Sequence, residues 1–166
     1  MKRTAIIVVF LVLMSFIGIW IWYAHKYEMD TVIPIKVKDS SLTTKVLIAS
    51  QGSSFKDSLV LGMLRHYQNE DIYFKVIDAY TFFTVDIDKW DAIVIINSWE
   101  YNRPPFNLRK FIKNHPDQLD KLIVVSTVGS SNIVLKDVDV ISGESIITKA
   151  PKYTTILVER LNKIIK

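Results

Sequence analysis

The stretch "KVLIASQGSS" (residues 45–54) decides the fold, because an apolar run passes directly into a turn of small polar residues. A short run without polar interruption is typical of a strand buried on both faces of a sheet. The residues that follow, 55–67, place apolar side chains at helical spacing. The sequence therefore predicts a strand, a tight turn and a helix in immediate succession.

The same alternation continues to the C-terminus of the chain. Further strands are predicted at residues 72–79, 91–97, 121–128 and 138–141, and further helices at residues 108–115 and 152–165. Strand 72–79 alternates in part between apolar and polar side chains, which is typical of a sheet edge. Strands that alternate with helices predict an α/β domain, residues 45–166, with a parallel sheet covered on both faces.

The first 25 residues are predicted to form a membrane anchor. Residues 5–24 carry no charge, and as a helix they would measure roughly 30 Å, enough to cross the hydrocarbon layer. A cleaved signal peptide is the alternative interpretation, but its apolar region is usually shorter. Trp20, Trp22 and Tyr23 at the end of the run suit a membrane–water interface. We therefore expect residues 5–24 to contact the lipid bilayer and residues 26–44 to form a tether, in which "VIPIKV" (32–37) is briefly extended.

Basic residues indicate an orientation and argue against one class of partner. Lys2 and Arg3 precede the apolar run, which favours a single-pass protein of the cytoplasmic membrane with its N-terminus inside and its domain outside. The chain has 21 Lys and Arg against 17 Asp and Glu. Removing Lys2, Arg3 and Lys26, which flank the anchor, leaves 18 against 17. This balance predicts no nucleic-acid partner.

Three predicted loops leave the carboxyl ends of the strands: "SQGSS" (50–54), "SWEYNRPP" (98–105) and "TVGSS" (127–131). Parallel sheets bind ligands beyond these strand ends. In the first loop, Ser and Gly residues before a helix offer backbone N–H groups and hydroxyls that hold a phosphate without a basic side chain. The alternative interpretation is structural: Gly52 makes the turn while Ser53 or Ser54 caps the helix.

Aromatic residues in the second loop permit another kind of contact. Trp99 and Tyr101 are candidates for stacking on a flat heterocycle, with Gly129 and Ser130 approaching its far edge through backbone groups. The alternative is that Trp99 covers the end of the sheet while Tyr101 packs under the prolines. The sequence leaves both interpretations open.

Taken in order, the three loops resemble those of flavodoxins, and most closely the short bacterial flavodoxin-like branch. The resemblance covers the domain and includes "DVISGES" (139–145). It implies a three-layer sandwich with a five-stranded parallel sheet of order 2-1-3-4-5, and an FMN site with the phosphate on the first loop and the isoalloxazine beside the second. The residues it implies for FMN binding are Ser50, Gln51, Gly52, Ser53, Ser54, Ser98, Trp99, Tyr101, Thr127, Gly129 and Ser130.

Departures from the flavodoxin pattern keep more than one function open. Gln51 stands where the family has Ser or Thr, and Phe55 occupies a position that is commonly polar. The first hypothesis is a membrane-anchored flavoprotein that binds FMN and exchanges electrons with a membrane redox partner. The second is a cofactor-free flavodoxin-like module for interaction or structure at the membrane. A minor third hypothesis is FMN attached covalently to Ser145, because "DVISGES" partly resembles the Asp-x-x-Ser-Gly-Ala-Thr attachment sequence.

Other chemistry has little support in the sequence. His25, His66 and His115 are scattered, and no spacing of His, Cys and acidic residues predicts a metal site. No serine lies in a G-x-S-x-G turn of the kind that many hydrolases use. The sequence therefore predicts an electron carrier at most, and no hydrolytic centre.

Overall fold

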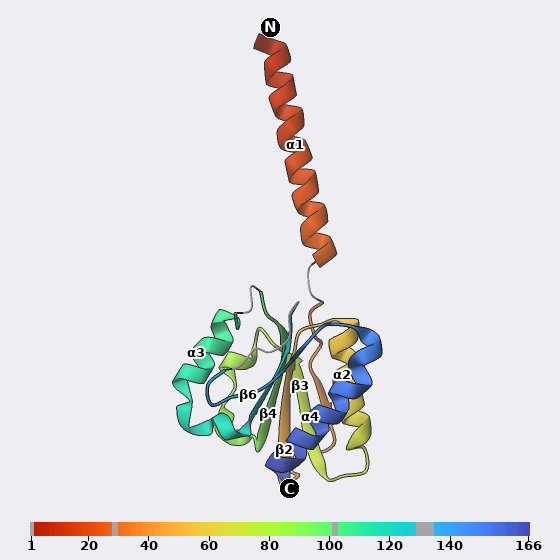
Figure 1. Cartoon of the computed structure of the whole chain (residues 1–166), viewed down its shortest axis with the longest axis vertical. Coiled ribbons are helices and arrows are strands. Elements are labelled where there is room, and N and C mark those ends of the chain that lie inside the picture. The colour runs from red at the N-terminus through yellow and green to blue at the C-terminus, as the bar shows by residue number, and fades with distance from the viewer. Residues whose placement is uncertain (1, 28–29, 101–102, 129–134) are drawn as a thin grey trace.

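A computed structural model of the chain describes residues 2–27, 30–100, 103–128 and 135–166. A long N-terminal helix precedes an α/β domain with a central sheet (Figure 1). The helices are α1 (Lys2–Tyr27), α2 (Ser54–His66), α3 (Phe106–Asn114) and α4 (Ala150–Ile165). The strands are β1 (Ile35–Val37), β2 (Thr44–Ser50), β3 (Ile72–Asp78), β4 (Ala92–Ser98), β5 (Leu122–Thr127) and β6 (Asp139–Gly143). The α/β class predicted from the sequence is confirmed.

The central sheet has the strand order β1-β3-β2-β4-β5-β6. Strands β3, β2, β4, β5 and β6 are parallel, in the order predicted for five strands. The predicted count of five is wrong, because β1 adds a sixth strand antiparallel to β3, with Ile35 opposite Val76. β1 lies in the segment 26–44 that the sequence assigns to the tether. Since β1 covers the outer side of β3, the edge position predicted for residues 72–79 is also wrong.

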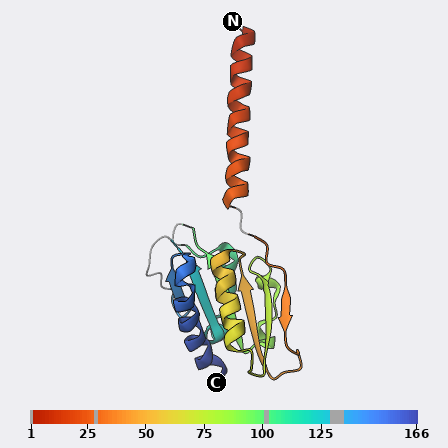
Figure 2. The same ribbon diagram turned by 90° about the vertical axis from the view of Figure 1, so that its right-hand side faces the viewer.

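Alternating side chains of the strands divide the core into two layers. Val46 and Ile48 of β2 belong to the layer beneath α2 and α4, whereas Leu47 and Ala49 belong to the layer beneath α3. All four are fully buried. Helices α2 and α4 lie side by side on one face (Figure 2), and α3 covers the other (Figure 1). Both faces of the sheet are therefore covered, which explains why its strands are continuous apolar runs.

α1 has the length and composition of a membrane-spanning helix. The candidate span, Arg3–Lys26, covers 24 residues, and none of it is buried in the part of the chain that the structure describes. The Ser15 hydroxyl donates to the Leu11 carbonyl oxygen, 2.9 Å away, so this polar group is satisfied within the helix. The helix is therefore consistent with the predicted single-pass anchor.

Before it reaches β1, the segment after α1 is hydrogen-bonded to the domain through Asp30 and Val32. The Gly52 N–H donates to the Asp30 carbonyl oxygen at 2.9 Å, and the Val32 N–H donates to the Asp78 carboxylate at 2.9 Å. Gly52 follows β2 and Asp78 ends β3, so both contacts lie at the carboxyl ends of parallel strands. The chain therefore crosses these strand ends before it returns along β3 as β1.

Candidate functional site

The carboxyl ends of the parallel strands lie together at one end of the sheet. β4 and β5 end in Ser98 and Thr127, which lie opposite each other in the strand register. The strand order changes direction between β2 and β4, and such switch points are where parallel sheets bind ligands. We call this end of the sheet the rim and define it by Gln51, which follows β2, together with Ser98 and Thr127.

A connected polar network joins these three rim residues to Lys56. The Ser98 N–H donates to Gln51 Oε1 at 2.6 Å. Lys56 Nζ donates to Ser98 Oγ at 2.9 Å and to Gln51 Oε1 at 3.3 Å. Ser98 Oγ and Thr127 Oγ1 share a hydrogen bond of 2.9 Å. The structure thus brings together one residue from each of the three predicted loops and adds a lysine behind them.

Lys56 is absent from the site residues predicted from the sequence. It lies in the first turn of α2, and none of its surface is exposed. Burial disfavours the ammonium and lowers the Lys56 pKa from 10.5 to about 8, while the Asp57 carboxylate acts in the opposite direction. The feature of the sequence that could have identified Lys56 is its spacing, since Lys56 lies on the same buried face of α2 as Val60 and Met63. A lysine on an apolar stripe is rarely buried without a partner.

The first predicted loop is occupied by contacts within the chain. Asp30 pairs with Gly52 as an isolated antiparallel bridge. Ser53 caps α2 by accepting the Lys56 N–H at 3.4 Å, as the capping interpretation expects. The Ser50 hydroxyl is buried and donates to the Gln51 carbonyl oxygen at 3.1 Å. Ser54 is the exposed first residue of α2.

Trp99 packs into the protein at the end of β4. Its side chain is 5% exposed and belongs to the core layer beneath α3. Its indole Nε1–H donates to Asn97 Oδ1 at 2.8 Å, and its backbone N–H donates to the Thr127 carbonyl oxygen at 3.1 Å. This geometry agrees with the packing interpretation. Tyr101, Gly129 and Ser130 lie outside the described residues.

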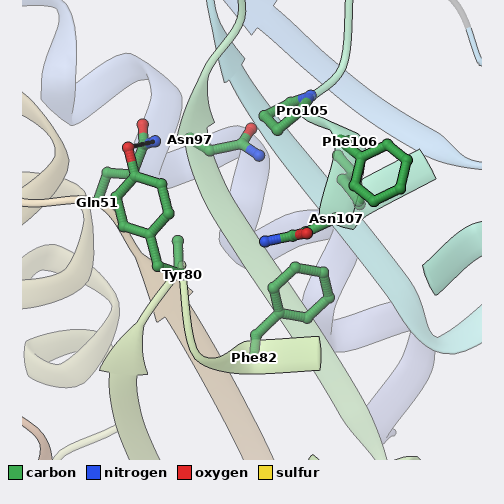
Figure 3. Close-up of a pocket in the computed structure, with 9 residues that line it drawn as sticks. Gln51, Tyr80, Phe82, Asn97, Pro105, Phe106 and Asn107 are labelled. Carbon is green, nitrogen blue, oxygen red and sulfur yellow. Dashed lines mark hydrogen bonds between the residues drawn. The ribbon is translucent and has the colours of Figure 1, made fainter. Parts of the chain in front are cut away.

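Three hollows adjoin the rim. One of about 250 Å³ opens toward α3 between Tyr80 and Phe106, where the Gln51 Nε2 donates to the Tyr80 hydroxyl at 3.4 Å (Figure 3). A second, of about 300 Å³, is lined by Gln51, Tyr80, Ser98, Glu100, Arg103, Pro104 and Pro105. A third, of about 350 Å³, is lined by Ser98, Trp99, Thr127, Val128, Glu144 and Ser145. Ser98 therefore borders two of the three hollows.

The surroundings of Ser145 are also defined. Ser145 is exposed and follows Glu144, whose carboxylate forms an ion pair with Lys149 Nζ at 2.6 Å. That partner raises the pKa of Lys149. Ser145 lies beside Ser98 at the third hollow, so the end of β6 also contributes to this region.

Comparisons with known proteins identify the fold. No family model and no curated protein matches the chain. The metal-soaked Flv1 flavodiiron core from Synechocystis sp. PCC6803 is similar over 75% of this chain and 36% of that chain, with a TM-score of 0.53 and 10% identity. A flavodoxin from the domain Archaea matches over 73% of this chain and 99% of its own, with a TM-score of 0.48 and 13% identity. Oxidised Flavodoxin 2 from Bacillus cereus matches over 70% and 99%, with a TM-score of 0.42 and 13% identity. The likeness to the Flv1 core concerns the fold alone, and it confirms the flavodoxin-like fold implied by the sequence.

Proposed function

We propose that this chain is a single-pass membrane protein whose flavodoxin-like domain works at the bilayer surface without a bound flavin, with the rim as its working face. The observation that carries this proposal is the pairing of Asp30 with Gly52. The pairing bears on the predicted flavin site and also on the distance between the rim and the membrane.

The described rim residues do not fit the FMN site implied by the flavodoxin resemblance. The Gly52 N–H, a candidate phosphate donor, already donates to the Asp30 carbonyl oxygen. A Cβ atom built on Gly52 would lie 2.1 Å from that oxygen, so the Asp30 backbone fills the space in front of the glycine. The buried Trp99 ring is not available to stack on a ligand. These contacts favour the cofactor-free hypothesis.

The same pairing supports a position of the rim close to the membrane. Tyr27 ends α1, and Asp30 follows three residues later. An extended chain spans at most about 3.6 Å per residue, so Asp30 lies within about 11 Å of the end of α1. With α1 in the bilayer, the strand ends beneath Asp30 are held at the lipid surface.

Exposed aromatic rings at the rim support contact with that surface. Tyr80 follows β3 and is 60% exposed, and Phe106 begins α3 and is 69% exposed. Both rings flank the hollow beside Gln51 (Figure 3). Tyrosine, with its apolar ring and polar hydroxyl, favours the membrane–water interface, and an exposed phenylalanine suits the apolar side of that boundary. The partner that fits this face is therefore the lipid headgroup region or a protein embedded in it.

Flavin titration of the full-length protein in detergent tests the proposal. We expect a colourless protein and no saturable quenching of FMN fluorescence, because Asp30 and the packed Trp99 remain in place. Trp99→Ala serves as a structural control: we expect it to lower stability by roughly 3–5 kcal/mol without changing the response to FMN.

Two outcomes would contradict the cofactor-free proposal in different ways. A yellow protein with flavin bands, released on denaturation, would favour the electron carrier with a membrane redox partner. Flavin that remains attached after denaturation, and that is lost in Ser145→Ala, would favour covalent attachment to Ser145.

A further inference from the structure

Ser98 and Lys56 form a pair whose geometry is that of a nucleophile and a base. The Lys56 Nζ lies 2.9 Å from Ser98 Oγ, within the range for proton transfer between a hydroxyl and an amine. Gln51 Oε1 contacts both residues, because it accepts from Lys56 Nζ and from the Ser98 N–H. Thr127 Oγ1 contacts Ser98 Oγ from the neighbouring strand. The pair is therefore fixed from two further sides.

Burial places the two members of the pair in different positions relative to solvent. Lys56 is fully buried, whereas Ser98 is only partly buried and borders two hollows. A ligand in either hollow meets the serine first, with the amine behind it. This arrangement suits a base that acts through the serine better than a cation that binds an anion directly.

The protonation states of the network can be followed through the hydrogen bonds. A protonated Lys56 donates to Ser98 Oγ, so the Ser98 hydroxyl hydrogen points to Thr127 Oγ1. When Lys56 loses a proton to solvent, its lone pair accepts the Ser98 hydrogen instead. Because burial lowers the pKa of Lys56 to about 8, the neutral amine is accessible in mildly alkaline solution.

We propose that Ser98 is a nucleophile activated by Lys56, and that the rim hydrolyses a neutral carboxylic ester through an acyl-serine intermediate. Ser98 Oγ bonds to the ester carbonyl carbon while its proton passes to Lys56 Nζ. The bond to the alcohol oxygen breaks, and the alcohol leaves with that proton. Water then gives a proton to the amine and attacks the acyl group, which releases the carboxylic acid and restores the Ser98 hydroxyl.

Charge at the hollows favours a neutral ester over a phosphate. Glu100 lies beside Arg103 in one hollow, and Glu144, paired with Lys149, borders the other. Each hollow therefore contains a carboxylate, and neither has the uniformly positive potential that would attract a phosphate. Pro104 and Pro105, which are only partly buried, supply the apolar surface that an acyl chain needs. This activity goes beyond the proposed function and rests on its cofactor-free rim, because Ser98 and Thr127 are also among the residues that the flavodoxin resemblance implies for FMN.

Covalent labelling with an alkyl fluorophosphonate tests the proposal on the full-length protein in detergent. We expect one phosphonyl adduct per chain, located on Ser98 by peptide mass spectrometry. The labelling rate should rise about tenfold between pH 7 and pH 9, because the neutral fraction of an amine with a pKa of about 8 rises from roughly 10% to 90%. Hydrolysis of a p-nitrophenyl ester should follow the same pH profile.

Variants separate a chemical role of Lys56 from a structural one. Ser98→Ala should abolish the adduct, and Lys56→Met should slow labelling at least a hundredfold and flatten the pH profile. Lys56→Arg keeps a cation but supplies no base in this range, so it should also be slow. Ser41→Ala, at an exposed turn just before the amino end of β2, should label like the unaltered chain.

Several results would overturn the proposal. They are no adduct on Ser98 at pH 9 in folded protein, labelling in Lys56→Arg at the unaltered rate, and an adduct whose rate does not depend on pH. If Lys56→Met does not fold, Lys56→Arg and the pH profile of the unaltered chain still decide the question.

Discussion

At the scale of the single residue, Lys56 determines the properties of the rim. A lysine that has no exposed surface loses the hydration of its ammonium, which is costly unless acceptors replace the water. Gln51 Oε1 and Ser98 Oγ supply two of these acceptors. The same contacts that satisfy the lysine therefore fix the orientation of Ser98 and of the Gln51 carboxamide.

The lowered pKa of Lys56 predicts a particular dependence of stability on pH. The unfolded chain keeps this lysine protonated up to about pH 10.5, whereas the folded chain releases the proton near pH 8. Between these values the unfolded state binds more protons, so the free energy of unfolding rises with pH. The cost of burying the ammonium is thus fully present below pH 8 and is relieved above it. We expect a gain of no more than about 3 kcal/mol from this residue.

Denaturant unfolding from pH 7 to pH 9.5 measures this effect, with Lys56→Met as the reference. The upper limit stays below pH 10, where Tyr67 begins to ionise in the unfolded chain but not in the folded chain, in which burial raises its pKa to about 12. Met fills a similar volume and does not titrate, so the rise should disappear in the variant. Parallel curves for the two proteins would show that Lys56 keeps its ordinary pKa in the folded chain.

At the scale of the element, β1 protects the sheet. Its pairing with β3 leaves β1, rather than a long central strand, at the edge. An open strand edge presents unpaired N–H and C=O groups that promote aggregation. A strand of three residues is short enough to limit that hazard.

Removal of β1 should therefore destabilise the domain. A chain that begins at residue 30 keeps β1, whereas one that begins at residue 40 lacks it. We expect the shorter chain to lose roughly 1–3 kcal/mol of stability, since it loses the β1–β3 ladder and the contacts of Asp30 and Val32, and to aggregate through β3. Denaturant midpoints and size-exclusion chromatography measure both effects. Two monomeric proteins of equal stability would mean that β1 is dispensable.

The elements also show what the sequence can and cannot predict. The parallel strands were predictable because burial on both faces makes them continuous apolar runs, such as residues 45–50 and 121–127. "VIPIKV" (32–37) was predicted to be extended, but β1 was not predicted as a strand of the sheet, because three residues after Pro34 carry no periodic signal and only pairing with β3 places them there. Gln51, Ser98 and Thr127 were found because strand ends meet at one edge. Lys56 was missed because its role depends on the inward direction of one helical turn.

At the scale of the whole molecule, orientation in the membrane is the main prediction. The basic residues before α1 favour a cytoplasmic N-terminus and an external domain. The chain contains no cysteine, so single cysteines can report on each side. In intact spheroplasts, a membrane-impermeant maleimide should label Ser41→Cys and Lys166→Cys, because both substitutions replace exposed residues.

A cysteine in place of Lys2 provides the control for this experiment. It should be protected in intact cells and labelled after permeabilisation with detergent. The reverse pattern would place the domain in the cytoplasm. Labelled domain in the soluble fraction would indicate that α1 is cleaved instead of anchoring the chain.

The short connection between α1 and Gly52 has a mechanical consequence. If a thicker bilayer or a moving neighbour pulls on α1, the force acts first on the hydrogen bond between Asp30 and Gly52. One such bond is worth only about 1 kcal/mol, so it yields before the ladder that joins β1 to β3. We therefore expect tension along the anchor to detach Asp30 from Gly52 while the sheet stays folded.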